Sequence, residues 1–448
     1  MLDLSAGKEG KLIFQFAAPM LIGNVFQQLF SIIDTIIVGN FIGKEALAAV
    51  GASFPVIFMM VSLIIGLVMG TTVVISQYFG AKDFVKVKRA IDTMYVYSAG
   101  AGIIVTAAGL IFAQPLLRLL GLPEEIMPQA TQYLRIFFSG IIIFFGFNGT
   151  SAALRGLGDS KTPLYFLIIA TVVNIILDLL FVAVFKWGIA GAAYATIIAN
   201  GLAFGLAIFW LNKTHKLIRI AIKGLHFDRE IFRQSIRIGL PTGIQHTLVA
   251  LGNLALLGIV NTFGTNVIAG FSVAIRLDNL STIPAITFSQ ALSTFVGQNI
   301  GAGKTERIRS GLIATLKMAG GVTIATTVFI VLFGKMLVSL FTNDAEVIFT
   351  GNQYLTIVSI FYITLTLMFM YNGIMRGAGD TFWPMIFSLI SLWIIRIPVA
   401  WYLSGKIGAV GIWWSIPAGW LIGLILSFIY YKMGRWKTKA VVNFNGNL

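Results

Sequence analysis

The chain has 448 residues, 57% of them apolar and 11% charged. Soluble domains carry roughly 25% charged residues, so the composition excludes an ordinary water-soluble protein. The absence of cysteine excludes disulfides, haem thiolates and thiolate zinc sites, and the net charge of +15 has to be explained by where the basic residues fall.

Twelve apolar stretches follow one another along the chain, and each is long enough to span a bilayer, which takes about 20 residues per helix. They are expected at residues 12–38, 48–75, 90–112, 131–153, 163–185, 189–211, 236–262, 267–296, 311–333, 353–374, 384–404 and 409–431. The first stretch is too long for a signal peptide and lacks a small-residue cleavage site. The pattern predicts an all-α integral membrane protein.

The polar segments between these stretches predict the domain organisation. Residues 1–11 form a short cytoplasmic lead, and residues 12–211 form an N-lobe of six spans. Residues 212–235 form a basic, amphipathic linker that is expected to lie along the cytoplasmic face. Residues 236–431 form a C-lobe of six spans, and residues 432–448 form a cytoplasmic tail.

The basic residues set the orientation of the chain. With both termini in the cytoplasm, most of the 32 Lys and Arg residues fall in cytoplasmic loops, including Lys82 to Arg89 and Lys213 to Arg237. This is the positive-inside bias of a multi-pass protein of the cytoplasmic (inner) membrane. The positive charge is therefore explained by the topology of the chain in the membrane. Membrane lipid is the expected surrounding, and no nucleic-acid partner is expected.

The two halves repeat one another at an interval of 221 residues. The recurring motifs are Gln77-x-x-Gly80-Ala81 with Gln298-x-x-Gly301-Ala302, Gln132-Tyr133-Leu134 with Gln353-Tyr354-Leu355, and Arg155-Gly156-x-Gly158-Asp159 with Arg376-Gly377-x-Gly379-Asp380. Because each half has an even number of spans, the repeats are parallel and related by an axis along the membrane normal. Two such bundles predict a central cleft of the kind that carriers open alternately to each side.

The repeated Arg-Gly-x-Gly-Asp segments are expected to be tight cytoplasmic turns. Their glycines permit the positive φ of a helix C-cap, and Thr162-Pro163 resembles an N-cap followed by a first-turn proline. Within each turn we expect the arginine and the aspartate to pair. A gating role for that pair is the alternative.

Three acids fall inside predicted spans: Asp34, Asp178 and Asp278. A carboxylate at mid-bilayer costs roughly 2.5–3.5 kcal/mol, so such residues usually face a cavity and handle protons or ions. Helix rise places Asp34 about 6 Å, and Asp178 and Thr196 about 10 Å, below the outer ends of their spans. Asn174 lies one helical turn before Asp178 and shares its face.

This set of oxygen groups predicts a cation or proton site in the first half. Oxygen ligands suit a hard cation such as Na⁺, whereas two neighbouring carboxylates can share a proton. An interfacial position for Asp34 and a structural role for Asp178 are the alternatives. The repeat interval maps Asp34 to Ala255 and Asp178 to Val399, so the second half does not copy the acids.

The second half has other candidate residues for the cleft or the substrate. Asp278 follows Arg276 by two residues, which predicts a local neutralising pair or a cavity wall, with substrate contact as the alternative. Arg396 faces either a group of carbonyls or the cleft. His246 has no partner at metal-ligand spacing, so it is expected to pack or to line the cleft, and no metal beyond Na⁺ is expected.

Over nearly its whole length the chain resembles the multidrug and toxic compound extrusion (MATE) family, in its DinF-like branch. The resemblance is carried by Pro19, by the Asp34-Thr35-x-x-x-Gly39 stretch, by both Gln-x-x-Gly-Ala motifs and by both Arg-Gly-x-Gly-Asp turns. It implies two six-helix lobes around a cavity and export of amphipathic organic cations in exchange for H⁺ or Na⁺. It also implies a first-lobe cation site built from Asp34, Asn174, Asp178 and Thr196.

The expected function is therefore ion-driven antiport by a monomer, with span one bending at Pro19, H⁺ or Na⁺ as the coupling ion and no other cofactor. A lipid-linked oligosaccharide flippase is the alternative, but it would need more basic cavity residues than Arg276 and Arg396. A channel fits the duplicated lobes less well. No enzyme is expected, because the sequence lacks a metal-ligand cluster, a Ser/His/Asp spacing and a nucleotide loop.

Overall fold

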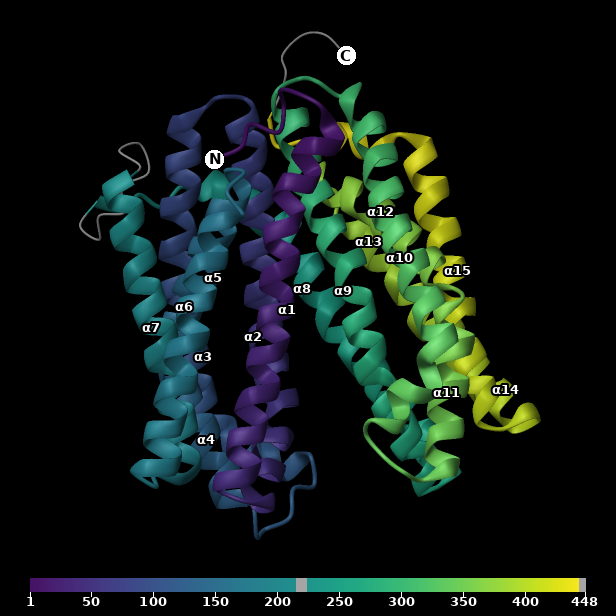
Figure 1. Cartoon of the computed structure of the whole chain (residues 1–448). Helices are drawn as coiled ribbons and strands as arrows, with labels where there is room; N and C mark the ends of the chain where they lie inside the picture. Colours follow the sequence, from purple (N-terminus) through teal and green to yellow (C-terminus); the bar gives the residue numbers. More distant parts are fainter. Residues whose placement is uncertain (215–223, 443–448) are drawn as a thin grey trace. The chain divides into compact units, whose positions relative to one another are not determined.

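The computed structural model describes residues 1–214 and 224–442, which form helices joined by turns, with no β-strand among the described residues (Figure 1). The central part of the predicted linker, 212–235, and the end of the predicted tail, 432–448, lie outside these ranges. The linker's predicted position along the membrane face therefore stays a prediction.

The helices of the first half are α1 (Glu9–Phe41), α2 (Lys44–Gly80), α3 (Phe84–Leu119), α4 (Met127–Ser139), α5 (Ile141–Gly156), α6 (Lys161–Asp178), the π-helical η1 (Leu179–Val184) and α7 (Gly188–Thr214). Those of the second half are α8 (Arg229–Val260), the 3-10 turn η4 (Asn261–Phe263), α9 (Thr265–Gly301), α10 (Arg307–Ser339), α11 (Ala345–Ser359), α12 (Tyr362–Gly377), α13 (Phe382–Leu389), the π-helical η5 (Ile390–Arg396), α14 (Ile397–Ile407), α15 (Ala409–Met433) and the 3-10 turn η6 (Arg435–Lys439).

These helices supply the spans of a multi-pass membrane protein. In the described residues, nine helical stretches are long and apolar enough to cross a membrane, and the bent pairs α4–α5 and α11–α12 raise the number to eleven. The helix α9 is the twelfth: like its counterpart α2 it has 37 residues, but it is more polar. Its polar residues are tolerated because nearly every residue from Ala285 to Gly301 is buried in protein.

Two of the predicted spans are bent, which the apolar pattern did not indicate. The angle is 51° between α4 and α5 and 50° between α11 and α12. At the first break, a Cβ on Gly140 would lie 2.5 Å from the Ile197 side chain, so glycine allows α7 to approach closely. The second break, at Ile360 and Phe361, has no glycine.

The Arg-Gly-x-Gly-Asp turns confirm the predicted C-caps but not the predicted pairing. Gly158 and Gly379 have φ values of 80° and 90°. Asp159 does not pair with Arg155: its carboxylate accepts hydrogen bonds from the Thr162 backbone N at 3.0 Å and from the Thr162 hydroxyl at 2.7 Å. Asp159, rather than Thr162, therefore caps α6, because a carboxylate satisfies the free N–H groups of a helix start.

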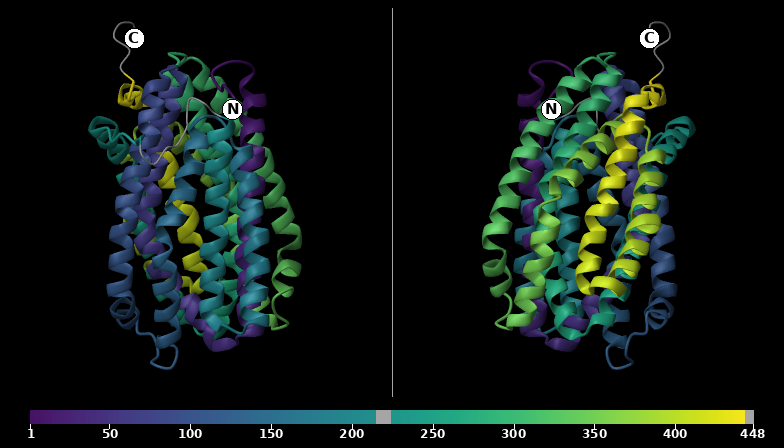
Figure 2. Two further views of the ribbon diagram at one scale, coloured as in Figure 1. Left: turned by 90° about the vertical axis from the view of Figure 1, so that its left-hand side faces the viewer. Right: turned by 90° about the vertical axis from the view of Figure 1, so that its right-hand side faces the viewer.

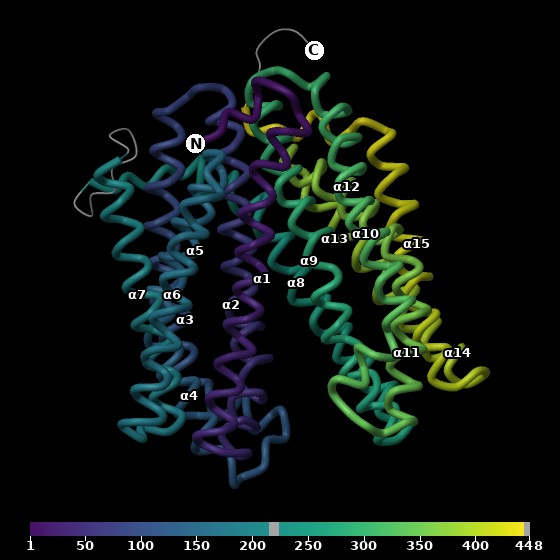
Figure 3. The backbone as a smooth tube through the Cα atoms, in the orientation of Figure 1, coloured from purple at the N-terminus to yellow at the C-terminus, as the bar shows by residue number. Residues whose placement is uncertain are grey.

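The described chain divides into two compact units. The N-terminal unit contains Met1–Asp3 and Ala18–Gly243, and the C-terminal unit contains Leu4–Ala17 and Ile244–Leu448. The division thus falls inside α1 and α8 and not in the linker, where the lobe boundary was expected. Figure 3 shows the start of α1 and the end of α15 at the same end of the C-terminal unit, and the right-hand view in Figure 2 shows α15 beside the α13–α14 span.

Glycines hold the first part of α8 in the N-terminal unit. A Cβ on Gly66 of α2 would lie 2.3 Å from the Gly243 backbone N, and one on Gly239 would lie 2.6 Å from the Leu67 Cα. Gly70 completes a Gly-x-x-x-Gly pair on α2 that matches Gly239 and Gly243 on α8. Such small-residue pairs let helix backbones touch within a membrane.

Polar contacts hold the first residues of the chain in the C-terminal unit. The Leu4 backbone N donates to Gln298 Oε1 at 2.8 Å, and Asn299 Nδ2 donates to the Leu4 carbonyl at 3.1 Å. Arg307 pairs with Glu9 at 3.2 Å. The helix α1 then passes into the N-terminal unit at Ala18 and continues through Pro19 as one unbroken helix.

Candidate functional site

The two acids of the predicted site meet within the N-terminal unit. Asp34 lies on α1, and Asp178 is the last residue of α6. Their carboxyl groups are within hydrogen-bonding reach of each other. Asp178 is fully buried and Asp34 is half-buried. Two carboxyl groups in contact repel each other when both are ionised, so the pair favours a shared proton or a bound cation.

Asn174 and Thr196 join the acids as the sequence predicted. With its amide oriented to satisfy both neighbours, Asn174 donates to Asp178 Oδ2 at 2.8 Å and accepts from the Thr196 backbone N at 3.1 Å. The Thr196 hydroxyl donates to the Ala192 carbonyl at 3.1 Å and keeps its oxygen lone pairs free to act as a ligand. The structure thus brings all four residues together.

One oxygen of this site has no hydrogen-bond donor. Asp178 Oδ1 is buried without a donor among the described residues, although most buried polar atoms have one. The π-helical η1 begins at the next residue, Leu179, and π-helical turns are frequent at functional sites. A buried acceptor beside a second carboxyl group is suited to a proton or to a small cation.

Tyr133 of α4 belongs to this site, although we did not predict it. Its ring is 8% exposed, and it lies within electrostatic reach of both Asp34 and Asp178. The signal was present in the sequence, because Tyr133 is part of the motif that recurs at Tyr354. In the sequence, that motif by itself indicates only duplication.

Asp278 lies in a separate cluster in the C-terminal unit. The Tyr362 hydroxyl donates to Asp278 Oδ1 at 2.7 Å, and the Tyr354 hydroxyl also hydrogen-bonds this carboxylate. Arg396, at the end of η5, is the cation whose charge acts on Asp278. Arg396 was predicted to face either carbonyls or the cleft, and in the structure it is part of this cluster.

Arg276 does not neutralise Asp278, contrary to the predicted local pair. Arg276 is exposed, whereas Asp278 is buried, and the two form no ion pair in the described part of the chain. Residues two apart on a helix point to different faces, which is why the pairing fails. His246 is half-buried on α8, within electrostatic reach of Arg376.

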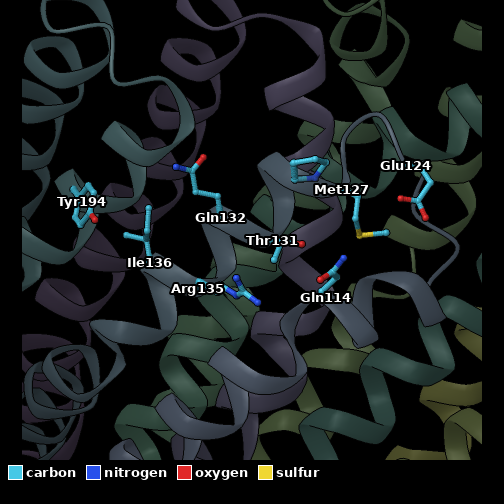
Figure 4. Close-up of a pocket in the computed structure, with 9 residues that line it drawn as sticks. Gln114, Glu124, Met127, Thr131, Gln132, Arg135, Ile136 and Tyr194 are labelled. Atoms are coloured by element: carbon cyan, nitrogen blue, oxygen red, sulfur yellow. The ribbon is translucent and has the colours of Figure 1, made fainter.

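A pocket of about 490 Å³ lies elsewhere in the N-terminal unit, between α3, α4 and α7 (Figure 4). Polar side chains that line it include Gln114, Glu124, Thr131 and Arg135. Thr131 and Arg135, which belong to α4, lie on a different face of that helix from Tyr133, so the pocket is separate from the acid pair. None of the four predicted site residues lines it.

Comparisons with known proteins agree with the resemblance in the sequence. The MatE family model matches residues 19–180 and 241–402, a block in each half. The chain is 37% identical over 435 residues to the probable multidrug resistance protein YpnP of Bacillus subtilis (strain 168), covering 97% of each chain. It is 30% identical over 450 residues to the probable multidrug resistance protein NorM of Thermotoga maritima, covering 96% of this chain and 94% of NorM.

A solved structure is similar over the full fold. It is the outward-facing conformation of a multidrug resistance MATE family transporter of the MOP superfamily, with a TM-score of 0.91 and 26% sequence identity. The match covers 97% of this chain and 98% of that chain. These comparisons do not test the DinF-like branch, which stays a prediction.

Proposed function

Because the chain belongs to the MATE family of membrane transporters, we propose that it exports small amphipathic organic cations in exchange for H⁺ or Na⁺. The observation that carries this proposal is the contact between Asp34 and Asp178, with Asn174 donating to the deeper acid. Two acids in contact within a membrane protein are unfavourable when both are ionised, so the pair favours uptake of a cation.

Competition for charge supplies the coupling. When a proton or Na⁺ neutralises the acids, a cationic substrate loses the negative charge that attracts it. The coupling is reciprocal, since a substrate that favours the ionised acids lowers their affinity for the coupling ion by the same factor. Entry of the coupling ion down its gradient therefore drives export of the substrate.

Movement of α1 is the proposed link between the acids and the substrate path. Only 17% of the residues in the most apolar stretch of α1 are buried, against 50% in α2, so α1 has few contacts to lose when it moves. Proline inside a helix removes one backbone hydrogen bond and lowers the cost of bending. We expect Pro19 to be the bend that lets the Asp34 end of α1 shift when the ion binds.

The positive-inside bias supports a position in the cytoplasmic membrane with both termini in the cytoplasm. The flippase alternative loses support, because it needs several basic cavity residues for pyrophosphate. Of its two candidate arginines, Arg396 lies within electrostatic reach of the buried Asp278.

Cells that accumulate a fluorescent organic cation provide the direct test. We expect the protein to lower accumulation, and we expect Asp34→Asn to raise it to the level of cells without the protein, because the acid pair is lost. Glu45→Gln is the matched control, since Glu45 is an exposed acid on the neighbouring helix α2. Unchanged efflux by Asp34→Asn would rule out this coupling site.

A second measurement identifies the ion. Proteoliposomes at fixed pH, with a Na⁺ gradient replaced by a K⁺ gradient, should lose uptake if Na⁺ is the coupling ion. If the proton is the coupling ion, uptake should instead follow an imposed pH gradient.

A further inference from the structure

The Asp278 cluster joins four elements of the C-terminal unit around one carboxylate. Asp278 is on α9, Tyr354 on α11, Tyr362 on α12 and Arg396 at the end of η5. The two tyrosines lie on either side of the break between α11 and α12, and both donate hydrogen bonds to Asp278. Asp278 is 9% exposed, so the charge of its carboxylate needs a partner within the protein.

Arg396 supplies the balancing charge without contacting the carboxylate. Its charge acts on Asp278 and on Tyr354, yet the ion pairs within 4.0 Å in the described residues do not include it. Its Nε is buried and has no hydrogen-bond partner in the described part of the chain. The guanidinium therefore acts on Asp278 as a nearby charge and not as one half of a bidentate salt bridge.

The two units carry different charges beside a tyrosine that the repeat places in both. In the N-terminal unit, the acid pair consists of two carboxyl groups next to Tyr133. Among the described residues, no cationic side chain interacts with Asp34 or Asp178. In the C-terminal unit, one carboxyl group lies next to Tyr354, and a guanidinium is present. Tyr133 and Tyr354 are equivalent in the repeat, so the same position borders both clusters.

The fifth span of each half supplies the residue that sets the net charge of its cluster. Asp178 lies in the α6–η1 span, immediately before η1, and Arg396 lies in the α13–α14 span as the last residue of η5. Each unit thus places an ionisable side chain at the edge of a π-helical segment. In the N-terminal unit this side chain is Asp178, a second acid, which favours binding of an exchangeable cation. In the C-terminal unit it is Arg396, a cation that is itself part of the chain.

We propose that Asp278 marks a second cation site, in which Arg396 takes the place that an exchangeable ion has at the Asp34–Asp178 pair. The site is neutral with Arg396 in place and binds no ion from solution. When the Arg396 charge is removed, the site takes a proton or a monovalent cation such as Na⁺, bound by the Asp278 carboxylate and the tyrosine oxygens. The C-terminal unit then adds no coupling ion to the transport cycle of the native protein.

Cation binding by purified protein in nanodiscs tests this, in a background of Asp34→Asn with Asp178→Asn that silences the first site. The probes are ²²Na⁺ and, in a weakly buffered sample, protons released when the pH is raised. We expect no Na⁺-binding site in the background variant. Adding Arg396→Gln should produce a site for about one cation per protein, because a buried carboxylate without a counter-charge must be neutralised.

Three further variants make the result specific. Adding Asp278→Asn to Arg396→Gln should abolish the new site, and Arg396→Lys should create none, because the tethered charge is kept. Arg276→Gln is the matched control, since Arg276 is exposed and only two residues from Asp278, and it should also create none. No gain with Arg396→Gln, or an equal gain with Arg276→Gln, would overturn the proposal.

The proposal also predicts what happens if Arg396→Gln prevents folding. If Arg396→Gln yields no folded protein, the double variant Arg396→Gln with Asp278→Asn should fold, because it leaves no orphaned charge. If the double variant fails as well, the proposal is wrong. Since the first site is silenced throughout, these outcomes are independent of whether Asp34 and Asp178 couple transport.

Discussion

Asp178→Asn is expected to eliminate ion-driven efflux almost completely while leaving the protein folded. Asp178 is fully buried, its Oδ2 accepts a hydrogen bond from the Asn174 amide, and its Oδ1 has no donor among the residues that the structure describes. The substitution removes half of the charge that attracts the coupling ion. It also removes a buried, incompletely satisfied carboxyl group, so stability should not fall.

Substrate uptake by proteoliposomes under an imposed ion gradient measures the loss, and a thermal melt of the same sample checks folding. The double variant Asp34→Asn with Asp178→Asn should be no more defective than Asp178→Asn alone, because residues that act as a unit are not additive. Glu45→Gln serves again as the control. If the two single losses are partial and multiply in the double variant, the acids act independently and the shared-site mechanism fails.

Gly66→Ala and Gly239→Ala are expected to destabilise the protein severely. The added Cβ would lie 2.3 Å from the Gly243 backbone N in the first case and 2.6 Å from the Leu67 Cα in the second. Overpacking of a core typically costs about 1–3 kcal/mol, and we expect at least the upper end of that range because the obstacle is backbone, which cannot change rotamer.

Melting temperature and the yield of monodisperse protein measure this effect. Gly51→Ala on α2 and Gly258→Ala on α8 are matched controls on the same two helices, because a Cβ at either position would meet nothing within 4 Å. These controls should be neutral or slightly stabilising, since alanine favours helix over glycine. Equal losses in both sets would mean that helix propensity, and not the close crossing, determines the effect.

The fold and the acid pair could be predicted from the sequence because they follow from helix geometry and from the interval of the internal repeat. Helix rise placed Asp178 and Thr196 at one depth, and the one-turn spacing placed Asn174 on the face of Asp178. The interval of 221 residues predicted the paired turns, whose glycines have positive φ in both copies. Each of these inferences needed only local helix geometry and one repeat length.

The remaining features depend on neighbours that are distant in sequence. The break at Ile360 has no glycine or proline to mark it, and the partners of Asp278 come from α11, α12 and η5. The Arg276–Asp278 pairing was wrong because nearness in sequence was taken for nearness in space. The sequence does not predict the role of Tyr133, because a tyrosine that recurs in both halves is explained by duplication alone as well as by a role in a site.

The division inside α1 and α8 has a practical meaning for recombining this chain with its relatives. Each unit includes a segment from the other half of the sequence. Leu4–Ala17 belongs to the C-terminal unit, and the start of α8 up to Gly243 belongs to the N-terminal unit. A chimaera joined in the linker would therefore combine Gly239 and Gly243 of one parent with Gly66 and Gly70 of the other. Splice points after Asp3, after Ala17 and after Gly243 take all residues of each unit from a single parent.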